Sequence, residues 1–321
     1  MEEQLSLFDE KHILVNTGTS ALISLHLESA RKTFQRYKDI YGDSNNMQSK
    51  LKIVDFLLAG LTQCPMDSPE EPAGLYRLWN AFADYAHEIH CTDTNILSGI
   101  KDSLFKKIME EIDQWDLTDV PFFLDHVPTG YIYMEAGDID HAIGSLQASI
   151  AATEQNALLY GYLGDAYTLR EEPDVARRCY LEALLAGAED IDWNYLKDGE
   201  LAALREHLIE EYDRDEAQAG EWLPTHAVIR GLFKCKTLRL REEIKRFVDE
   251  YRVMQKAYSR DRSPRLGARL FIRSIILCGN EALIKLIQGM ELVAIRKKMK
   301  EIDPELFSQY MKSIKDRKAQ R

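Results

Sequence analysis

The chain of 321 residues has few of the residues that interrupt helices. Its 9 prolines and 17 glycines are thinly spread, and the alternation of apolar and polar residues that marks a half-buried strand is hard to find. Apolar runs are short as well, because the most apolar of them, residues 270–279, contains Arg273. A membrane span needs about 20 consecutive apolar residues. These absences predict an all-α protein without a membrane-spanning helix.

Cysteines are few and follow no pattern. No pair has the CxxC spacing of metal and redox sites, and an odd number does not indicate a disulfide framework; the five are Cys64, Cys91, Cys179, Cys235 and Cys278. The first residues, MEEQLSLFDEKH, are acidic and do not have the basic and then apolar pattern of a secretory signal. These features predict reduced thiols and a cytoplasmic location.

Motifs of reaction chemistry are missing too. The chain has no GxxxxGK[ST] loop, no GxGxxG after a strand and no GxSxG turn, and NTGTS at 16–20 fits a helix cap better. His87 and His90 lie three residues apart, with Cys91 adjacent, and two such ligands on one helix face could hold zinc, but the sequence places no third or fourth ligand beside them, so we interpret them as packing residues. We therefore expect a non-enzymatic protein with no cofactor and no metal, and keep an enzyme of unrecognised type as the weakest alternative.

The first third of the chain is predicted to be helical. Residues 1–17 are expected to form a flexible acidic tail. The N-terminal helical region, 18–118, then holds four helices, each marked by a cap, a proline or apolar residues at helical spacing. These helices are expected over 19–42, 47–61, 68–90 and 94–115.

A repeat follows. Segment 127–152 aligns with segment 161–186 at a constant offset of 34 residues, which pairs Gly130 with Gly164, Tyr133 with Tyr167, Ala142 with Ala176, Leu146 with Tyr180, and Ser149 with Ala183. Small residues allow the two antiparallel helices of a unit to approach closely, and bulky residues fill the gap to the next unit. The turns between the helices are expected at 135–138 and 170–174.

The pattern resembles the tetratricopeptide repeat, over about residues 119–187. The resemblance implies an all-α, right-handed helical-repeat stack, in which divergent flanking helices cap the two clear units. One further step of 34 residues reaches Asp198, where the pattern is degenerate. The expected regions are therefore a repeat region at 119–225 and a C-terminal helical region at 226–321.

The resemblance also implies a groove, because the first helix of each tetratricopeptide unit lines a concave surface that binds peptides. The residues facing it here would be Leu124, Val127, Tyr131, Met134 and Glu135, and then Leu158, Asp165, Thr168 and Leu169. This lining is apolar and acidic, which favours a basic or amphipathic partner segment. The same side chains would be core if the flanking helices cover them, and both interpretations stay open.

Charge is divided unevenly along the chain. Residues 226–321 have 24 Lys and Arg against 11 Asp and Glu, whereas residues 1–225 have 17 against 42. The basic part also contains aromatic residues, which could stack on bases: Phe233, Tyr251, Tyr258 and Phe271. Nucleic-acid binding by this part is therefore an alternative. A further interpretation pairs the basic and acidic parts, within one chain or between two chains.

A short motif lies near the N-terminus. QLSLF at 4–8 resembles the peptide by which bacterial replication and repair proteins bind the sliding clamp, with Gln4, Leu7 and Phe8 as anchors and Leu5 between them. Taken together, the sequence predicts a cytoplasmic scaffold that binds a protein or peptide in a helical groove, with a helical-repeat nucleic-acid-binding protein as the alternative.

Overall fold

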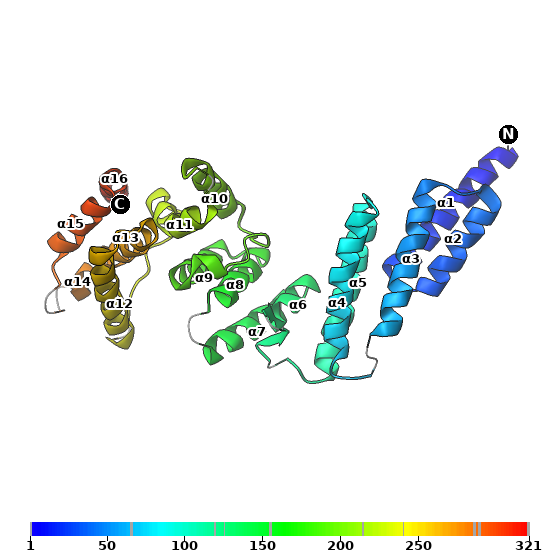
Figure 1. Ribbon diagram of the computed structural model, residues 1–321, viewed down its shortest axis with the longest axis horizontal. Coiled ribbons are helices and arrows are strands. Elements are labelled where there is room, and N and C mark those ends of the chain that lie inside the picture. Colours follow the sequence, from blue (N-terminus) through cyan, green and yellow to red (C-terminus); the bar gives the residue numbers. More distant parts are fainter. Residues whose placement is uncertain are drawn as a thin grey trace. The chain divides into compact units, whose positions relative to one another are not determined.

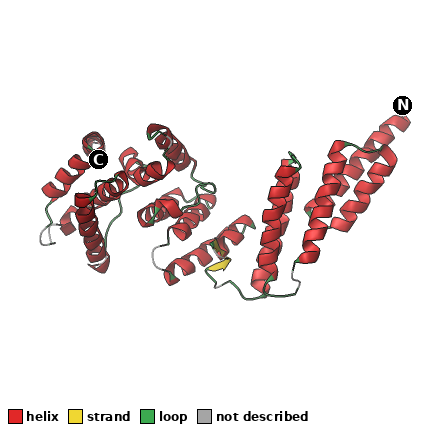
Figure 2. Ribbon diagram, in the orientation of Figure 1, coloured by secondary structure: helices red, strands yellow, loops and turns green. Residues whose placement is uncertain are grey.

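A computed structural model shows an all-α protein, in which the described residues contain one short hairpin besides the helices (Figure 2). The structure describes residues 2–64, 67–118, 120–124, 126–153, 156–213, 215–239, 241–284, 287 and 290–319, with the side chains of 2–9, 45 and 318 left out. The chain divides into two compact units, unit 1 (Met1–Ser149) and unit 2 (Ile150–Arg321). This boundary lies between the expected ones at 118 and 225, and it places the two predicted repeat segments in different units.

Unit 1 is a row of helices, followed by a short β-hairpin and the helical hairpin α6–α7 (Figure 1). Helix α1 packs on α2 and α5, and each of α2 to α5 packs on the next helix along the chain. The fully buried side chains of this core include Phe34, Phe82 and Phe105. Its elements are α1 (Glu2–Ile23), α2 (Leu27–Tyr41), α3 (Asn45–Gln63), α4 (Glu71–Glu88), α5 (Thr94–Gln114), β1 (Phe122–Leu124), β2 (Val127–Pro128), α6 (Thr129–Glu135) and α7 (Ile139–Ala152).

Two expectations for the N-terminal region are wrong. The backbone is helical from Glu2, where we expected a flexible tail over 1–17, and the single helix expected over 19–42 is two helices. The chain turns at Leu25, which has a left-handed φ of 57°. The amide of His26 donates back to the carbonyl of Ala21 at 2.8 Å, which closes the end of α1. No glycine or proline marks this turn, so the helical spacing of the sequence continues across it and predicts one helix.

Unit 2 is built around helices α11 and α13 (Figure 1). Helix α11 contacts α9, α10, α13 and α16, and α13 contacts α12 and α15 in addition. Most of the side chains on α13 are buried, including Phe271. The elements are α8 (Ala157–Leu169), α9 (Pro173–Ala186), η1 (Ala188–Asp190), α10 (Gly199–Glu211), α11 (Glu216–Arg230), α12 (Arg241–Arg260), α13 (Pro264–Gly279), α14 (Glu281–Ile284), α15 (Leu292–Ile302) and α16 (Pro304–Ala319).

The five cysteines are free thiols set into the two units. Cys179 and Cys278 are buried, and the others are half-buried. Burial raises the pKa of Cys179 to about 12 and that of Cys235 to about 11, and it also raises the pKa of Cys64 and Cys278. In the described part of the chain, none of the helices combines the length and the apolar character that a bilayer crossing requires.

Candidate functional site

The predicted repeat-packing residues lie in two similar helical hairpins, one in each unit. In unit 1, a Cβ atom added to Gly130 of α6 would lie 2.5 Å from Cγ of Leu146 and 3.0 Å from the carbonyl oxygen of Ala142, both on α7. In unit 2, a Cβ at Gly164 of α8 would lie 2.6 Å from the ring of Tyr180 on α9. The remaining predicted packing residues are buried as well, namely Tyr133, Tyr167, Ala176 and Ala183. The small residue and its bulky neighbour thus set the distance between the two helices of each hairpin.

The groove-facing residues expected in unit 1 are occupied by contacts within the unit. Leu124 and Val127 are not helical, because they lie in the β1–β2 hairpin, and α6 begins only at Thr129. The ring of Tyr131 packs edge-on against Phe105 of α5 at a centroid distance of 5.9 Å. Met134 is buried, and Glu135 forms an ion pair with Lys101 of α5. This face of α6 therefore packs on α5.

The expected groove residues of unit 2 are partly covered too. Asp165 is 3% exposed, and its Oδ1 accepts hydrogen bonds from the Tyr180 hydroxyl at 2.6 Å and from the Lys197 amide at 2.8 Å. Leu158 and Thr168 are half-buried, and Leu169 is exposed. The segment 191–198 thus lies over Asp165, where we expected room for a peptide.

Burial raises the pKa of Asp165 to about 7, although both hydrogen bonds lower it. The same carboxylate raises the pKa of the Tyr180 hydroxyl, after the larger effect of burial. Asp165 is therefore a titratable group of the α8–α9 hairpin, enclosed by its own chain.

Two other expected features have no assembled site. The segment with Gln4, Leu5, Leu7 and Phe8 has a helical backbone within α1, and its side chains lie outside the described residues. His87 and His90 lie at the end of α4, and no group of three or more His, Cys, Asp or Glu side chains suited to a metal ion occurs among the residues that the structure describes.

The basic C-terminal part pairs with acidic residues of its own unit. Lys234 contacts Asp174 at 2.7 Å, and Lys236 contacts Glu182 at 2.8 Å. Three of the four aromatic residues expected to stack on bases, Phe233, Tyr251 and Phe271, are at most 1% exposed. The composition of unit 2 is nearly neutral, with 30 Lys and Arg against 29 Asp and Glu, whereas unit 1 has 11 against 24.

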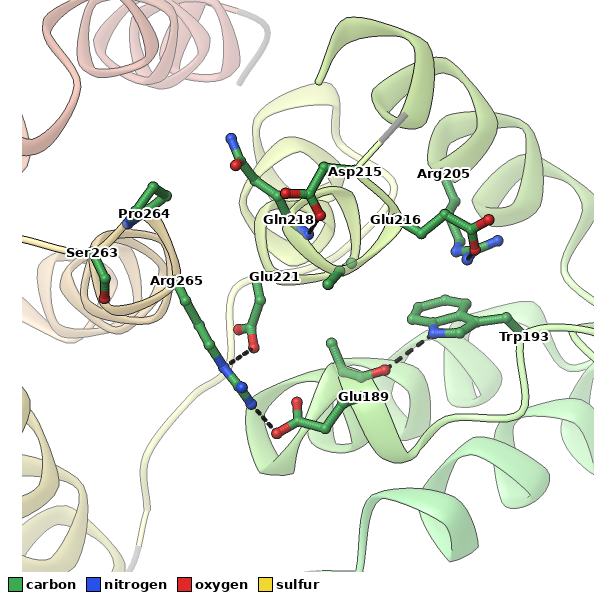
Figure 3. A pocket seen from close by; sticks show the side chains of 13 residues that line it. Glu189, Trp193, Arg205, Asp215, Glu216, Gln218, Glu221, Ser263, Pro264 and Arg265 are labelled. Atoms are coloured by element: carbon green, nitrogen blue, oxygen red, sulfur yellow. Dashed lines mark hydrogen bonds and ion pairs between the residues drawn. The ribbon is translucent and has the colours of Figure 1, made fainter. Parts of the chain in front are cut away.

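The candidate site is a surface pocket of about 460 Å³ in unit 2, which we call the α11 pocket (Figure 3). Small residues from η1 and α11 form its floor, and the beginnings of α11 and α13 form its rim. Gly220 is part of this floor, and a Cβ there would meet Ala188 and Trp193 at ordinary contact distances of 3.5 and 3.6 Å. The lining residues are Ala188, Glu189, Trp193, Arg205, Asp215, Glu216, Ala217, Gln218, Gly220, Glu221, Ser263, Pro264 and Arg265.

One wall of the pocket is an aromatic ring fixed by its neighbours. The indole nitrogen of Trp193 donates to the carbonyl oxygen of Ala188 at 3.1 Å, as Figure 3 shows. The guanidinium of Arg205 lies 4.6 Å from the Trp193 ring centre and donates to Glu216 at 2.7 Å. The hydrogen bond at the indole nitrogen and the guanidinium stacked on the ring hold Trp193 in place, so the ring offers a rigid apolar surface.

The opposite wall is formed by Glu189, Glu221 and Arg265, and Arg269, which does not itself line the pocket, pairs with both glutamates. Glu221, whose side chain is 6% exposed, accepts from Arg269, whose single Nε–H is shared between the two carboxylate oxygens at 3.0 and 2.8 Å and whose Nη2 donates at 2.7 Å. Nε of Arg265 also contacts Glu221, at 2.9 Å, and both arginines reach Glu189. The glutamates are the main reason that the pKa of Arg269 is raised.

The α11 pocket can hold a small apolar group beside a positive charge. Four carboxylates line it, against two guanidinium groups. The helix starts in its rim are already capped, because Asp215 accepts from the Gln218 amide at 2.9 Å and Ser263 accepts from the Leu266 amide at 3.4 Å. An anion would therefore meet negative side chains and satisfied helix ends.

Sequence reasoning missed this site. Helix α11 contains Pro224 and has no clear apolar stripe, so we did not single it out. A usable signal was the spacing of Arg265, Arg269 and Arg273, which places three arginines on one side of α13. No protein-family model matches the chain, and neither a curated protein nor a solved structure is significantly similar to it.

Proposed function

We propose that the protein is a non-enzymatic protein–protein interaction protein, and that it holds a basic or amphipathic partner segment in the α11 pocket of unit 2. The observation that carries this proposal is the lining of the pocket, which joins a rigid Trp193 wall and a small-residue floor to four carboxylates. Apolar anchors and flanking charges are the usual elements of peptide recognition.

The partner is still the basic or amphipathic segment that the sequence predicts, but we propose that it binds in the α11 pocket and not in a tetratricopeptide-like groove. The residues expected in a tetratricopeptide-like groove include Asp165, Tyr131 and Glu135, which already contact their own unit. The pocket, in contrast, is open at the surface. A cytoplasmic scaffold of the helical-repeat type remains part of the proposal, supported by the all-α fold and by the two similar hairpins.

Nucleic acid is the less favoured partner. Stacking on bases needs exposed aromatic faces, and Phe233, Tyr251 and Phe271 are buried. Arg269, Arg273 and Lys236 contact residues of their own unit, so they are less available to phosphates.

The experiment is a selection of random-sequence displayed peptides on the full chain. We expect the enriched peptides to contain an apolar residue beside Arg or Lys. Their affinity for A217W should fall at least about tenfold, because Ala217 lies exposed in the first turn of α11 and a large side chain there fills the pocket.

The matched control is A294W, which adds the same ring to an exposed alanine on α15, outside the pocket. Its affinity for the enriched peptides should equal that of the unchanged chain. The proposal is wrong if no peptide is enriched, or if the enriched peptides bind A217W as tightly as A294W.

A further inference from the structure

The side chain of Arg265 lies in the α11 pocket and pairs with two of its carboxylates. Its Nε contacts Glu221 at 2.9 Å and its Nη2 contacts Glu189, so the guanidinium covers the two carboxylates of one wall (Figure 3). The side chain nevertheless stays 53% exposed. The pocket thus already holds a cation, and this cation belongs to the protein itself.

The buried glutamate does not depend on Arg265 for its neutralisation. The Nε and Nη2 donors of Arg269 satisfy Glu221, and the side chain of Arg269 is only 25% exposed. A bidentate pair of this kind is the strong form of a carboxylate–arginine contact. Arg265 is therefore the second and weaker cation of the cluster.

The position of Arg265 in its helix also weakens its hold. It is the second residue of α13, directly after Pro264, where the helix dipole disfavours a positive charge. Exposed ion pairs contribute little to stability, because water and salt screen them and a long side chain must be ordered. Moving Arg265 away from Glu189 and Glu221 is thus easy, and another cation can take its place.

We propose that Arg265 is an internal competitor in the α11 pocket, and that the ligand which displaces it is an arginine or lysine side chain of a partner protein. This inference rests on the proposed function and adds two points. The ligand group is a cationic side chain, and competition from Arg265 lowers its affinity for the pocket. Glu189 and Glu221, the two lining carboxylates that Arg265 contacts, supply the charge complementarity.

The test uses the full chain and two small probes, N-acetyl-arginine amide and N-acetyl-citrulline amide. Citrulline has nearly the same shape and no charge. The readout is the indole N–H signal of Trp193 in a nitrogen–proton correlation spectrum, identified with W193F. We expect the arginine probe to shift this signal in a saturable way and the citrulline probe to leave it unchanged.

The second arm compares R265A with R262A. Arg262 is exposed, lies three residues before Arg265 and does not line the pocket, so its removal takes away the same charge nearby. R265A should bind the arginine probe about twofold to fivefold more tightly than the unchanged chain, as expected for the loss of an exposed competing pair. R262A should differ by less than about 1.5-fold.

Several results would overturn the inference. The competitor role is contradicted if R265A binds the arginine probe no more tightly than the unchanged chain, or if R262A gains as much affinity as R265A. The proposed function still stands in that case if the selected peptides require an open pocket. Equal binding of the citrulline probe, or no binding of either probe, contradicts the ligand class. R265Q, which keeps the length of the side chain, repeats the test if R265A unfolds at a lower temperature.

Discussion

At the scale of single residues, Gly164 sets the spacing of the α8–α9 hairpin. A Cβ at this position would lie 2.6 Å from the Tyr180 ring, which is fully buried and hydrogen-bonded to Asp165. The ring has no room to move, so overpacking should lower the free energy of unfolding of G164A by about 1 to 3 kcal/mol. Urea denaturation of the purified chain measures this change.

Gly161, three residues earlier in α8, is the matched control. A Cβ there would meet only Ile191, at an ordinary contact distance of 3.6 Å. Alanine favours a helix by roughly 1 kcal/mol over glycine, so G161A should be neutral or more stable. Equal destabilisation by the two substitutions would contradict the spacing role of Gly164.

Asp165 makes stability depend on pH. Its pKa is raised to about 7 by burial, so between about pH 4 and pH 7 the folded protein keeps a proton that the unfolded chain has released. The contribution of Asp165 to the free energy of unfolding should therefore fall as the pH rises through this range, by up to about 4 kcal/mol, and change no further above it.

The measurement compares the unchanged chain with D165N between pH 4 and pH 8. Asparagine keeps an oxygen that accepts from Tyr180 and Lys197, and it does not titrate. Burial lowers the pKa of His226 to about 4, which changes stability in the opposite direction over the same range, and the comparison cancels this contribution. A difference between the two proteins that does not vary with pH would contradict the prediction.

At the scale of elements, Asn280 fixes the segment before α12 to the end of α13. Its Oδ1 accepts from the Leu238 amide at 3.1 Å, and its Nδ2 donates to the carbonyls of Lys236 and Ile276 at 2.9 and 2.8 Å. N280A would leave a buried amide unpaired at Leu238, and each such group costs about 1 to 3 kcal/mol.

We expect N280A to speed hydrogen exchange in residues 233–239 far more than in α8, because the segment loses its side-chain anchor. N194A, which shortens an exposed asparagine in the same unit, is the control and should leave the exchange pattern unchanged. Protection of 233–239 that survives in N280A would show that Leu238 and Phe233 hold the segment by packing alone.

The elements also show what the sequence could predict. Helical spacing and caps correctly indicated α3, α4, α5 and the two helical hairpins, because each has a local signal such as Asp93 or Pro173 at its start. The break at Leu25 and the β1–β2 hairpin were missed, since tertiary packing decides them and no glycine or proline marks them. The α11 pocket joins residues 70 or more positions apart, such as Trp193 and Arg265, so periodicity cannot find it.

At the scale of the whole molecule, the negative net charge resides in unit 1. Its excess of 13 acidic residues contrasts with a unit 2 in which the two signs nearly cancel. A field of this size attracts basic partners from a distance and raises their association rate.

The rate of association should therefore depend on salt. For a basic peptide selected on the full chain, raising NaCl from 20 to 500 mM should lower the association rate constant about tenfold, as screening shortens the range of the field. The dissociation rate constant should change less, because short-range contacts in the pocket set it. Stopped-flow fluorescence separates the two. An association rate constant that does not vary with salt would contradict a role for the charge of unit 1.

The five free thiols can report when each unit opens. Thiolates react with iodoacetamide, and burial raises the pKa of Cys64, Cys179, Cys235 and Cys278, which slows the modification of each of these thiols until its surroundings open. Cys64 and Cys91 lie in unit 1, and the other three lie in unit 2. Alkylation followed by peptide mass spectrometry would thus follow the opening of each unit separately, with the cysteines already present in the chain.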